Sequence, residues 1–300
     1  MPNPFAPSLA AWYAQHGRDL PWRHPECSSW GVLVSEVMLQ QTPVARVVGP
    51  WRQWVERWPT PPDLAATTPA DVLRQWGRLG YPRRALRLRQ TAITLTIIHA
   101  GAVPTTPEEL ATLPGIGPYT AAAVAAFAFG CRVVVLDTNI RRLLARAVTG
   151  QALPPPSPRA AERRLAEALL PETAGDSVIW NQAAMEFGAL VCTARSPGCA
   201  DCPVADDCAW RAHGCPPDPF AGQRRAQTWA GSDRQARGLI LAALRAAPDG
   251  LLAADALALI ADPTQARRAL AGLLADGLAA RQSDWLTLPS LPHLDGNLKA

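Results

Sequence analysis

The sequence predicts a mainly α-helical protein of about two domains. Apolar residues recur at helical spacing over most of the chain, and glycine or proline ends most of these segments. The short run Val133–Val135 is the only strand-like piece before the C-terminal part. Three hundred residues allow about two domains of ordinary size. The 48% hydrophobic content is ample for a core, and no uninterrupted apolar run approaches the length of a membrane span.

The expected helices follow one another along the chain with turn residues between them. Ser8 can cap a first helix, and Ser28 or Ser29 can cap an apolar helix over 30–41. Pro43 suits the first turn of the helix that follows. The further segments with helical character are 43–58, 69–80, 83–101, 107–130, 132–148, about 158–170 and about 175–191.

The C-terminal part has a different pattern. Residues 214–232 lack periodicity and look like a linker. Residues 233–300 indicate three helices and a short β-ribbon around Trp285, which is typical of a winged helix. A segment of about 70 residues is too small to be very stable alone. The expected domain limits are therefore 1–213 for the main region, 214–232 for the linker and 233–300 for a small C-terminal module.

Charge and composition say little about the binding partner, but they exclude one type of catalysis. The formal net charge of +4 is compatible with a polyanionic partner and says little more. The chain contains one lysine, Lys299, close to its C-terminus. Catalysis through a Schiff base on a lysine amine therefore has no candidate in the body of the protein.

Four cysteines lie within a short stretch at the spacing C-x6-C-x2-C-x5-C: Cys192, Cys199, Cys202 and Cys208. Thiolates are soft ligands that select zinc or iron–sulfur clusters. A zinc site is the first alternative, although such sites commonly use two C-x2-C pairs and this chain has one. Disulfides are the second alternative, but nothing at the N-terminus resembles a secretion signal. A [4Fe–4S] cluster is favoured over both alternatives, and the family resemblance described below contributes to this preference.

A glycine-rich turn lies at 113–128, in "LPGIGPYTAAAVAAFA". Gly115 and Gly117 permit a tight turn, and a helix begins directly after it. Backbone N–H groups at such a helix start can bind a DNA phosphate without reading bases. An ordinary interhelical turn is the simpler interpretation of the two glycines alone; the whole stretch favours a helix-hairpin-helix.

Two acidic residues differ in their local surroundings. A reaction that pairs a proton donor with an anionic carboxyl group, as the cleavage of glycosides does, needs such a difference. Glu36 lies in an apolar helix, where burial would favour the protonated form that a general acid needs. Asp137 begins a helix, where amide donors should keep it ionised. From local sequence alone, Asp137 can also be a simple N-cap and Glu36 an exposed helical acid.

With these features in place, the chain resembles the helix-hairpin-helix DNA glycosylases, and among them the adenine glycosylases of the MutY family. The resemblance covers about residues 8–212 and includes the stretches "RDLPWR", "SEVMLQQTPVARV", "GRLGYPRRALRL", "LPGIGPYTA", "LDTNIRRLLAR" and "NQAAMEFGALVC". It implies a two-lobed, all-helical fold with a [4Fe–4S] cluster loop and DNA bound at the cleft. The implied six-helix lobe is about 28–131, and the implied cluster lobe is formed by about 1–27 and 132–213.

The resemblance also assigns roles to individual residues. It implies that Glu36 protonates the adenine ring, that Asp137 stabilises the sugar cation and that Asn139 positions this site. A second group would line the adenine pocket: Arg18, Trp22, Arg23 and Glu186. A third group would contact DNA, partly as a wedge beside the opposite base: Gln40, Gln41, Thr42, Tyr81, Gly115, Gly117 and Thr120.

Tyr119, counted with the catalytic residues, distinguishes two branches of the family. In the related endonuclease III branch this place holds a lysine that attacks the sugar and cuts the strand. Since this chain has tyrosine there, we expect a monofunctional glycosylase that leaves the abasic site intact.

The residues around the predicted wedge also have simpler interpretations. For Tyr81 it is packing after a helix stop. For most of the arginines around Tyr81, the simpler interpretation is a solvated helical face, with one or two of them touching phosphate. These arginines are Arg74, Arg78, Arg83, Arg84, Arg87 and Arg89.

The chain departs from the family pattern in two places. Thr138 follows Asp137 where the family usually has glycine. Many MutY proteins also carry a Nudix-like domain that recognises 8-oxoguanine, and residues 233–300 are too few for one. We therefore expect recognition of the oxidised base to depend more on Gln41, Thr42 and Tyr81.

Two other functions fit parts of the sequence. A glycosylase for mismatched thymine or uracil can share the cluster and the tyrosine, but protonating a purine is the natural use of Glu36. A non-enzymatic iron–sulfur DNA-binding regulator would leave Glu36 and Asp137 without a role.

We expect a monomer that acts on duplex DNA containing adenine mispaired with 8-oxoguanine or guanine. We also expect no membrane association and a bacterial-type cytoplasmic location, at the nucleoid when the protein is bound to DNA.

Overall fold

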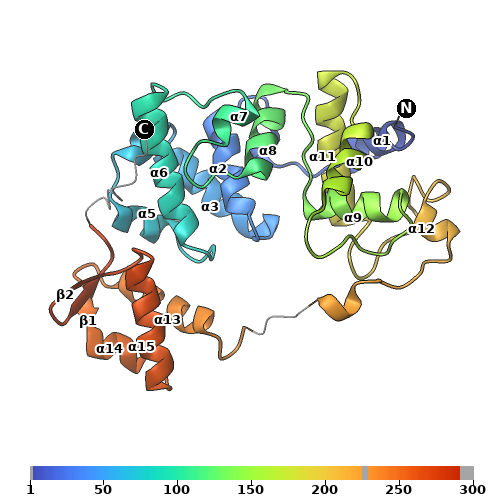
Figure 1. Cartoon of the computed structure of the whole chain (residues 1–300). Helices are drawn as coiled ribbons and strands as arrows, with labels where there is room; N and C mark the ends of the chain where they lie inside the picture. Colours follow the sequence, from blue (N-terminus) through green and yellow to red (C-terminus); the bar gives the residue numbers. More distant parts are fainter. Residues whose placement is uncertain (1–2, 225–228, 291–300) are drawn as a thin grey trace. The chain divides into compact units, whose positions relative to one another are not determined.

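The computed structural model describes residues 3–224 and 229–290 and is mainly helical (Figure 1). The chain forms two compact units. Unit 1 comprises Met1–Val32, Thr105–Ala111 and Gly117–Ala226, and unit 2 comprises Leu33–Pro104, Thr112–Ile116 and Gln227–Ala300. Within the described ranges, no helix combines the length and apolar character needed to cross a bilayer.

Unit 1 is built around the long helix α11 (Ala174–Leu190), which packs against α1 (Ala6–His16) and α9 (Thr138–Ala147). Their shared core contains Leu9, Ile140, Leu144, Ala183 and Phe187, all buried. The other elements of the unit are η1 (Pro21–Arg23), α7 (Pro107–Leu110), α8 (Pro118–Phe129), α10 (Ala160–Ala168), α12 (Ala209–Ala212) and η2 (Ala221–Gln223).

Two expectations for unit 1 were wrong. Helix α1 begins at Ala6 rather than after Ser8, with Phe5 as its N-cap. The run Val133–Val135 forms no strand. The side chain of Asn181 takes the place of a partner strand, because it accepts from the Val135 N at 3.4 Å and donates to the Val133 carbonyl at 2.9 Å.

Helix α2 (Ser29–Leu39) begins in unit 1 and continues into unit 2. The expected cap is confirmed, since the Ser28 hydroxyl accepts from the Gly31 N at 3.1 Å. Unit 2 continues with α3 (Val44–Arg57), α4 (Pro61–Ala65), α5 (Pro69–Trp76) and α6 (Arg83–Ile98). Helices α4 and α5 pack against α6, and the indole of Trp54 meets Trp58 and Trp76 edge-on at 4.6 and 5.5 Å between ring centroids.

The C-terminal module is the small domain at the end of unit 2. Its elements are α13 (Asp233–Ala246), β1 (Leu251–Leu252), α14 (Ala253–Ala258), α15 (Pro263–Ala275), β2 (Ala280–Gln282) and β3 (Trp285–Thr287). The strands form an antiparallel sheet in the order β1-β3-β2, with Leu286 paired to both Leu251 and Arg281. The expected three helices and β-ribbon are confirmed, and β1 completes the arrangement of a winged helix.

The compact units divide the chain differently from the expected domain limits. Helix α8 belongs to unit 1 rather than to a lobe ending near residue 131, because Ala122, Ala123 and Ala126 pack against Val135. The C-terminal module groups with unit 2 rather than standing alone.

Candidate active site

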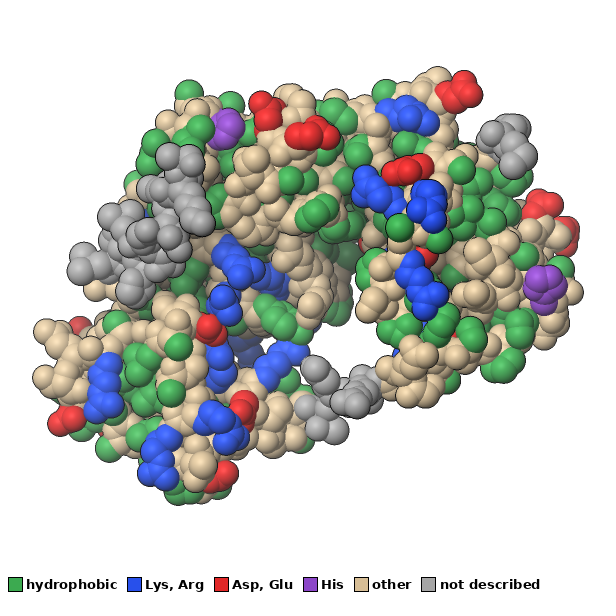
Figure 2. Space-filling model, viewed as in Figure 1, with side chains coloured by type: hydrophobic (Ala, Val, Ile, Leu, Met, Phe, Trp, Pro, Cys, Tyr) green, Lys and Arg blue, Asp and Glu red, His purple; other side chains and the backbone are tan. Residues whose placement is uncertain are grey.

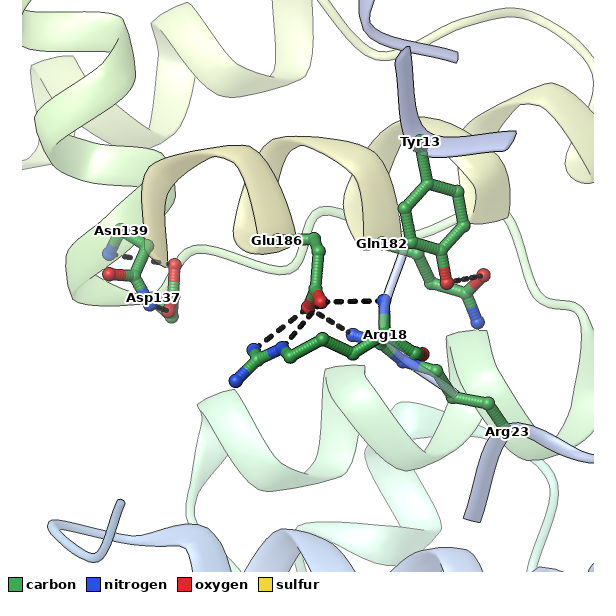
Figure 3. Close-up of polar contacts among 7 residues, drawn as sticks. All are labelled: Tyr13, Arg18, Arg23, Asp137, Asn139, Gln182 and Glu186. Carbon is green, nitrogen blue, oxygen red and sulfur yellow. Dashed lines mark hydrogen bonds and ion pairs between the residues drawn. The ribbon is translucent and has the colours of Figure 1, made fainter. Parts of the chain in front are cut away.

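Glu186 is a buried carboxylate on α11 that is bound by two arginines (Figure 3). Its Oε1 accepts from the Arg18 Nε at 2.6 Å and from the Arg18 backbone N at 3.0 Å. Its Oε2 accepts from the Arg18 Nη2 at 3.0 Å and the Arg23 Nη2 at 2.8 Å. Burial raises the pKa of Glu186, but the hydrogen bonds and charges of Arg18 and Arg23 outweigh this effect and hold the pKa at about 2.

The residues expected to line the adenine pocket therefore lie together in unit 1. Trp22 is buried in η1, the same short element that carries Arg23. Sequence reasoning missed Tyr13 and Gln182, whose side chains are 3.4 Å apart from Oη to Oε1 (Figure 3). Gln182 precedes Glu186 by one helical turn, and that spacing was the available signal for it. The chain thus gathers an aromatic ring, amide groups and charged groups, a combination suited to a purine.

Asp137 is the N-cap of α9, as expected from the sequence (Figure 3). Its Oδ1 accepts from the backbone N of Asn139 at 2.9 Å and of Ile140 at 2.7 Å, and its Oδ2 accepts from the Asn139 Nδ2 at 2.6 Å. Burial nevertheless raises the pKa of Asp137 more than these bonds and the Arg142 charge lower it. The expectation that amide donors keep the carboxyl group ionised therefore underestimated the effect of burial on its pKa.

Asn139 is held on its other side by Arg142 and by the close packing of α11. The Arg142 Nη2 donates to the Asn139 Oδ1 at 2.8 Å, and its Nε donates to the Cys192 carbonyl at 2.7 Å. A Cβ added to Gly188 would lie only 2.8 Å from the Asn139 Cβ and 2.9 Å from its carbonyl oxygen. Gly188 therefore allows α11 to approach α9 closely. Sequence reasoning missed this residue, although a glycine inside a helix is a signal of close packing.

Glu36 lies on the apolar helix α2 and only 5% of its surface is exposed. Its neighbours Val34, Val37 and Met38 are also buried. The alternative of an exposed helical acid is therefore wrong. A buried position is what a carboxyl group needs to donate a proton near neutral pH.

The two loops predicted to form the wedge, residues 40–42 and 80–81 (the wedge loops), both have left-handed backbone at one non-glycine residue: φ is 54° at Gln41 and 46° at Tyr81. Such a conformation costs about 1 kcal/mol and persists only when the surroundings hold it. One residue, Arg84 on α6, holds both loops. Its Nη1 donates to the carbonyls of Val37, Met38 and Gln40 at 2.8, 3.0 and 2.6 Å, and its Nη2 donates to the Gly80 carbonyl at 3.0 Å.

Two arginines expected on a solvated face are in fact buried. Arg84 is one, and burial lowers the pKa of its guanidinium to about 10. Arg89 is the other, and it donates to the Thr67 carbonyl at 2.6 Å. Thr42 is also buried, and its hydroxyl lies 3.0 Å from the Arg84 Nη2 and 3.3 Å from the Leu79 carbonyl. The Thr42 side chain thus contacts protein atoms between the two wedge loops, and its burial does not favour the expected contact with DNA.

The glycine turn between α7 and α8 has the form expected of a hairpin. Gly115 has a φ of 79°, and a Cβ there would lie 2.8 Å from the Arg87 Cβ, so glycine is required. Gly117 is the N-cap of α8 and has no side chain to cap the amide groups behind it. Tyr119 packs against the small-residue core of α8, and Thr120 is buried.

The comparisons with known proteins agree with this geometry. A model of the HhH-GPD superfamily base excision DNA repair proteins matches residues 34–171, and one of the iron-sulfur binding domain of endonuclease III matches residues 192–208. The chain is 51% identical over 282 residues to an adenine DNA glycosylase of Mycobacterium tuberculosis, covering 92% of this chain and 90% of that protein. The chain belongs to the adenine DNA glycosylase family.

More distant relatives agree with this placement. A human adenine DNA glycosylase is 42% identical over 218 residues, which cover 69% of this chain and 39% of that protein. Among solved structures, a thermostable thymine-DNA glycosylase has a TM-score of 0.63 at 27% identity, over 70% of this chain and 95% of that one. A trapped endonuclease III–DNA covalent intermediate has a TM-score of 0.61 at 23% identity over 70% and 95%, which shows the shared fold.

The four cysteines of the loop hold the [4Fe–4S] cluster of this family. In the structure all four line one pocket: Cys192, Cys199, Cys202 and Cys208. The match of residues 192–208 to an iron-sulfur binding domain decides against the zinc alternative. The Arg146 Nη1 lies 3.3 Å from the Cys192 Sγ and donates to the Thr193 carbonyl at 2.7 Å, which fixes the loop to α9. Burial raises the pKa of the Cys199 and Cys202 thiols, an effect that metal binding reverses.

Proposed function

We propose that this protein is a monomeric, cytoplasmic glycosylase that removes adenine mispaired with 8-oxoguanine or guanine from duplex DNA. The observation that carries the proposal is a buried acid, Glu36, in a chain half identical to adenine DNA glycosylases. A purine leaves its sugar far more easily when a ring nitrogen is protonated first, and a buried carboxyl group can supply that proton.

The proposed reaction divides the work between two carboxyl groups. The adenine is extruded from the duplex at a cost of a few kcal/mol. Glu36 transfers a proton to a ring nitrogen, and the N-glycosidic bond breaks with its electron pair leaving on the base. The Asp137 carboxylate, oriented by Asn139, stabilises the sugar cation until a water adds at the anomeric carbon and returns a proton to the Glu36 carboxylate. The proposal requires that both groups act on the same extruded nucleoside.

A base-release assay tests the proposal directly. Duplexes with A:8-oxoG, A:G, A:C and T:G pairs are compared, and adenine should be released from the first two. Glu36→Gln keeps the shape of the side chain but has no proton to give, so it should abolish release while duplex binding persists. Release of thymine from T:G would support the mismatch thymine glycosylase, and sequence-selective binding without any release would support a regulator.

We further propose that the enzyme leaves the abasic site uncut. Tyr119 occupies the place of the family's lyase lysine, and a phenol cannot form the Schiff base on which strand cutting by that lysine depends. Strand breaks should appear only after alkali. A covalent enzyme–DNA adduct trapped by borohydride without alkali would contradict this proposal.

A further inference from the structure

The C-terminal module is anchored to α5 and α6 by polar contacts within unit 2. The Arg245 Nε donates to the Leu73 carbonyl at 2.9 Å, and burial lowers the pKa of this guanidinium to about 10. Asp276 pairs with Arg83 at 3.2 Å and also with Arg237. Asp276 therefore joins one arginine of α6 to one of α13, and the module faces the turn that carries Tyr81.

The contact that suggests a function is made by Arg234, in the first turn of α13. Its guanidinium carbon lies 4.0 Å from the centroid of the Tyr81 ring and 5.2 Å from that of Trp229. The Tyr81 ring also has the Arg84 guanidinium at 5.5 Å. A proposed wedge residue thus lies against two cations, one supplied by α6 and one by the C-terminal module.

The charge of Arg234 is not neutralised within the described residues, where no acidic side chain forms an ion pair with it. The adjacent Asp233 is bound by Arg268, with 2.6 Å between the Asp233 Oδ1 and the Arg268 Nη2. Arg84 donates to backbone carbonyls and a hydroxyl, which leaves its charge in place as well. Figure 2 shows arginine side chains gathered where the module meets α6. Two unpaired cations beside an aromatic wedge favour an anionic ligand.

We propose that the C-terminal module is part of the DNA-binding surface and that Arg234 binds a backbone phosphate of the duplex beside Tyr81. A guanidinium in contact with an aromatic ring still has its N–H groups available, and phosphate oxygens match that donor set. The module lies outside both matched family models, which end at residues 171 and 208. The inference relies on the proposed function only for the choice of the mispaired duplex.

The test compares Arg234→Gln with Arg267→Gln in the full-length protein. Arg267 is exposed on α15, so the control removes the same charge from the same module. Both variants carry Glu36→Gln so that a mispaired adenine is retained. Dissociation constants are measured for undamaged and A:8-oxoG duplexes at several salt concentrations, and thermal unfolding shows that each variant is folded.

Arg234→Gln should weaken binding to the A:8-oxoG duplex about fivefold and lower the slope of log affinity against log salt by about one. Arg267→Gln should change neither quantity, and Arg234→Lys should restore the salt slope because it keeps the charge. The proposal is overturned if Arg234→Gln binds like its parent, or if the two glutamine variants weaken binding equally. Failure of the proposed function would appear separately, as wild-type protein that releases no adenine.

Discussion

Replacing Arg84 by methionine removes the guanidinium that holds both wedge loops while keeping most of the volume of the side chain. Three carbonyls of α2 and its C-terminal loop, those of Val37, Met38 and Gln40, lose a charged donor at 2.6–3.0 Å. The Gly80 carbonyl loses another at 3.0 Å. A hydrogen bond to a charged group contributes about 1.5–3 kcal/mol, but the burial of the charge offsets part of this sum. We expect a net loss of roughly 3–5 kcal/mol in the free energy of unfolding.

Urea unfolding of Arg84→Met and of Arg87→Met checks this value. Arg87 is exposed on the same helix, so methionine there removes an equal charge without a buried network, and its effect should stay within about 0.5 kcal/mol. Because Gln41 and Tyr81 lose their support, Arg84→Met should also bind mispaired and undamaged duplexes more equally. Equal stability of the two variants would refute the assignment of Arg84 as the support of both loops.

Three further outcomes follow from the contacts of unit 1. The pKa of Glu186 is held at about 2 in the folded protein, so its ionised form should contribute roughly 3 kcal/mol to the free energy of unfolding above pH 4.5. This contribution should be lost as the pH falls towards 2, and the urea midpoints of Glu186→Gln should lack this pH dependence. Gly188→Ala should lower both base release and the melting temperature, because its Cβ would meet the start of α9, whereas Gly175→Ala on the same helix meets nothing within 4 Å and should do neither. Cys199→Ser should reduce the iron content and the visible absorbance of the purified protein, and the exposed Cys215→Ser should leave both unchanged.

Most helices could be predicted from the sequence because periodicity and capping residues are local signals. Ser28 before α2 and Asp137 before α9 are examples, and both caps form as expected. The strand-like run Val133–Val135 was misleading, since β-branched residues favour extended backbone but cannot supply a partner strand. Here the partner is the side chain of Asn181, 46 residues from Val135, and no local pattern indicates it.

The candidate site was predictable in its residue types but not in its supports. Glu186, Arg18 and Arg23 come together as the family resemblance implied. Arg84 was placed on an exposed face for a physical reason: an arginine among exposed arginines has the same local sequence whether or not it is buried. A glycine inside a helix, such as Gly188, signals a special position but does not tell which neighbour lies against it. Burial and close approach depend on the whole fold, so coordinates are needed to identify the contact.

The support of the loops at Gln41 and Tyr81 has a consequence for the proposed search of DNA. In the proposed wedge role, loops that Arg84 already holds by hydrogen bonds would lose little conformational entropy at each encounter with the duplex. Each base pair can then be probed in a brief collision, without waiting for a disordered segment to become ordered. A rigid probe suits an enzyme that must inspect very many correct pairs for each rare error.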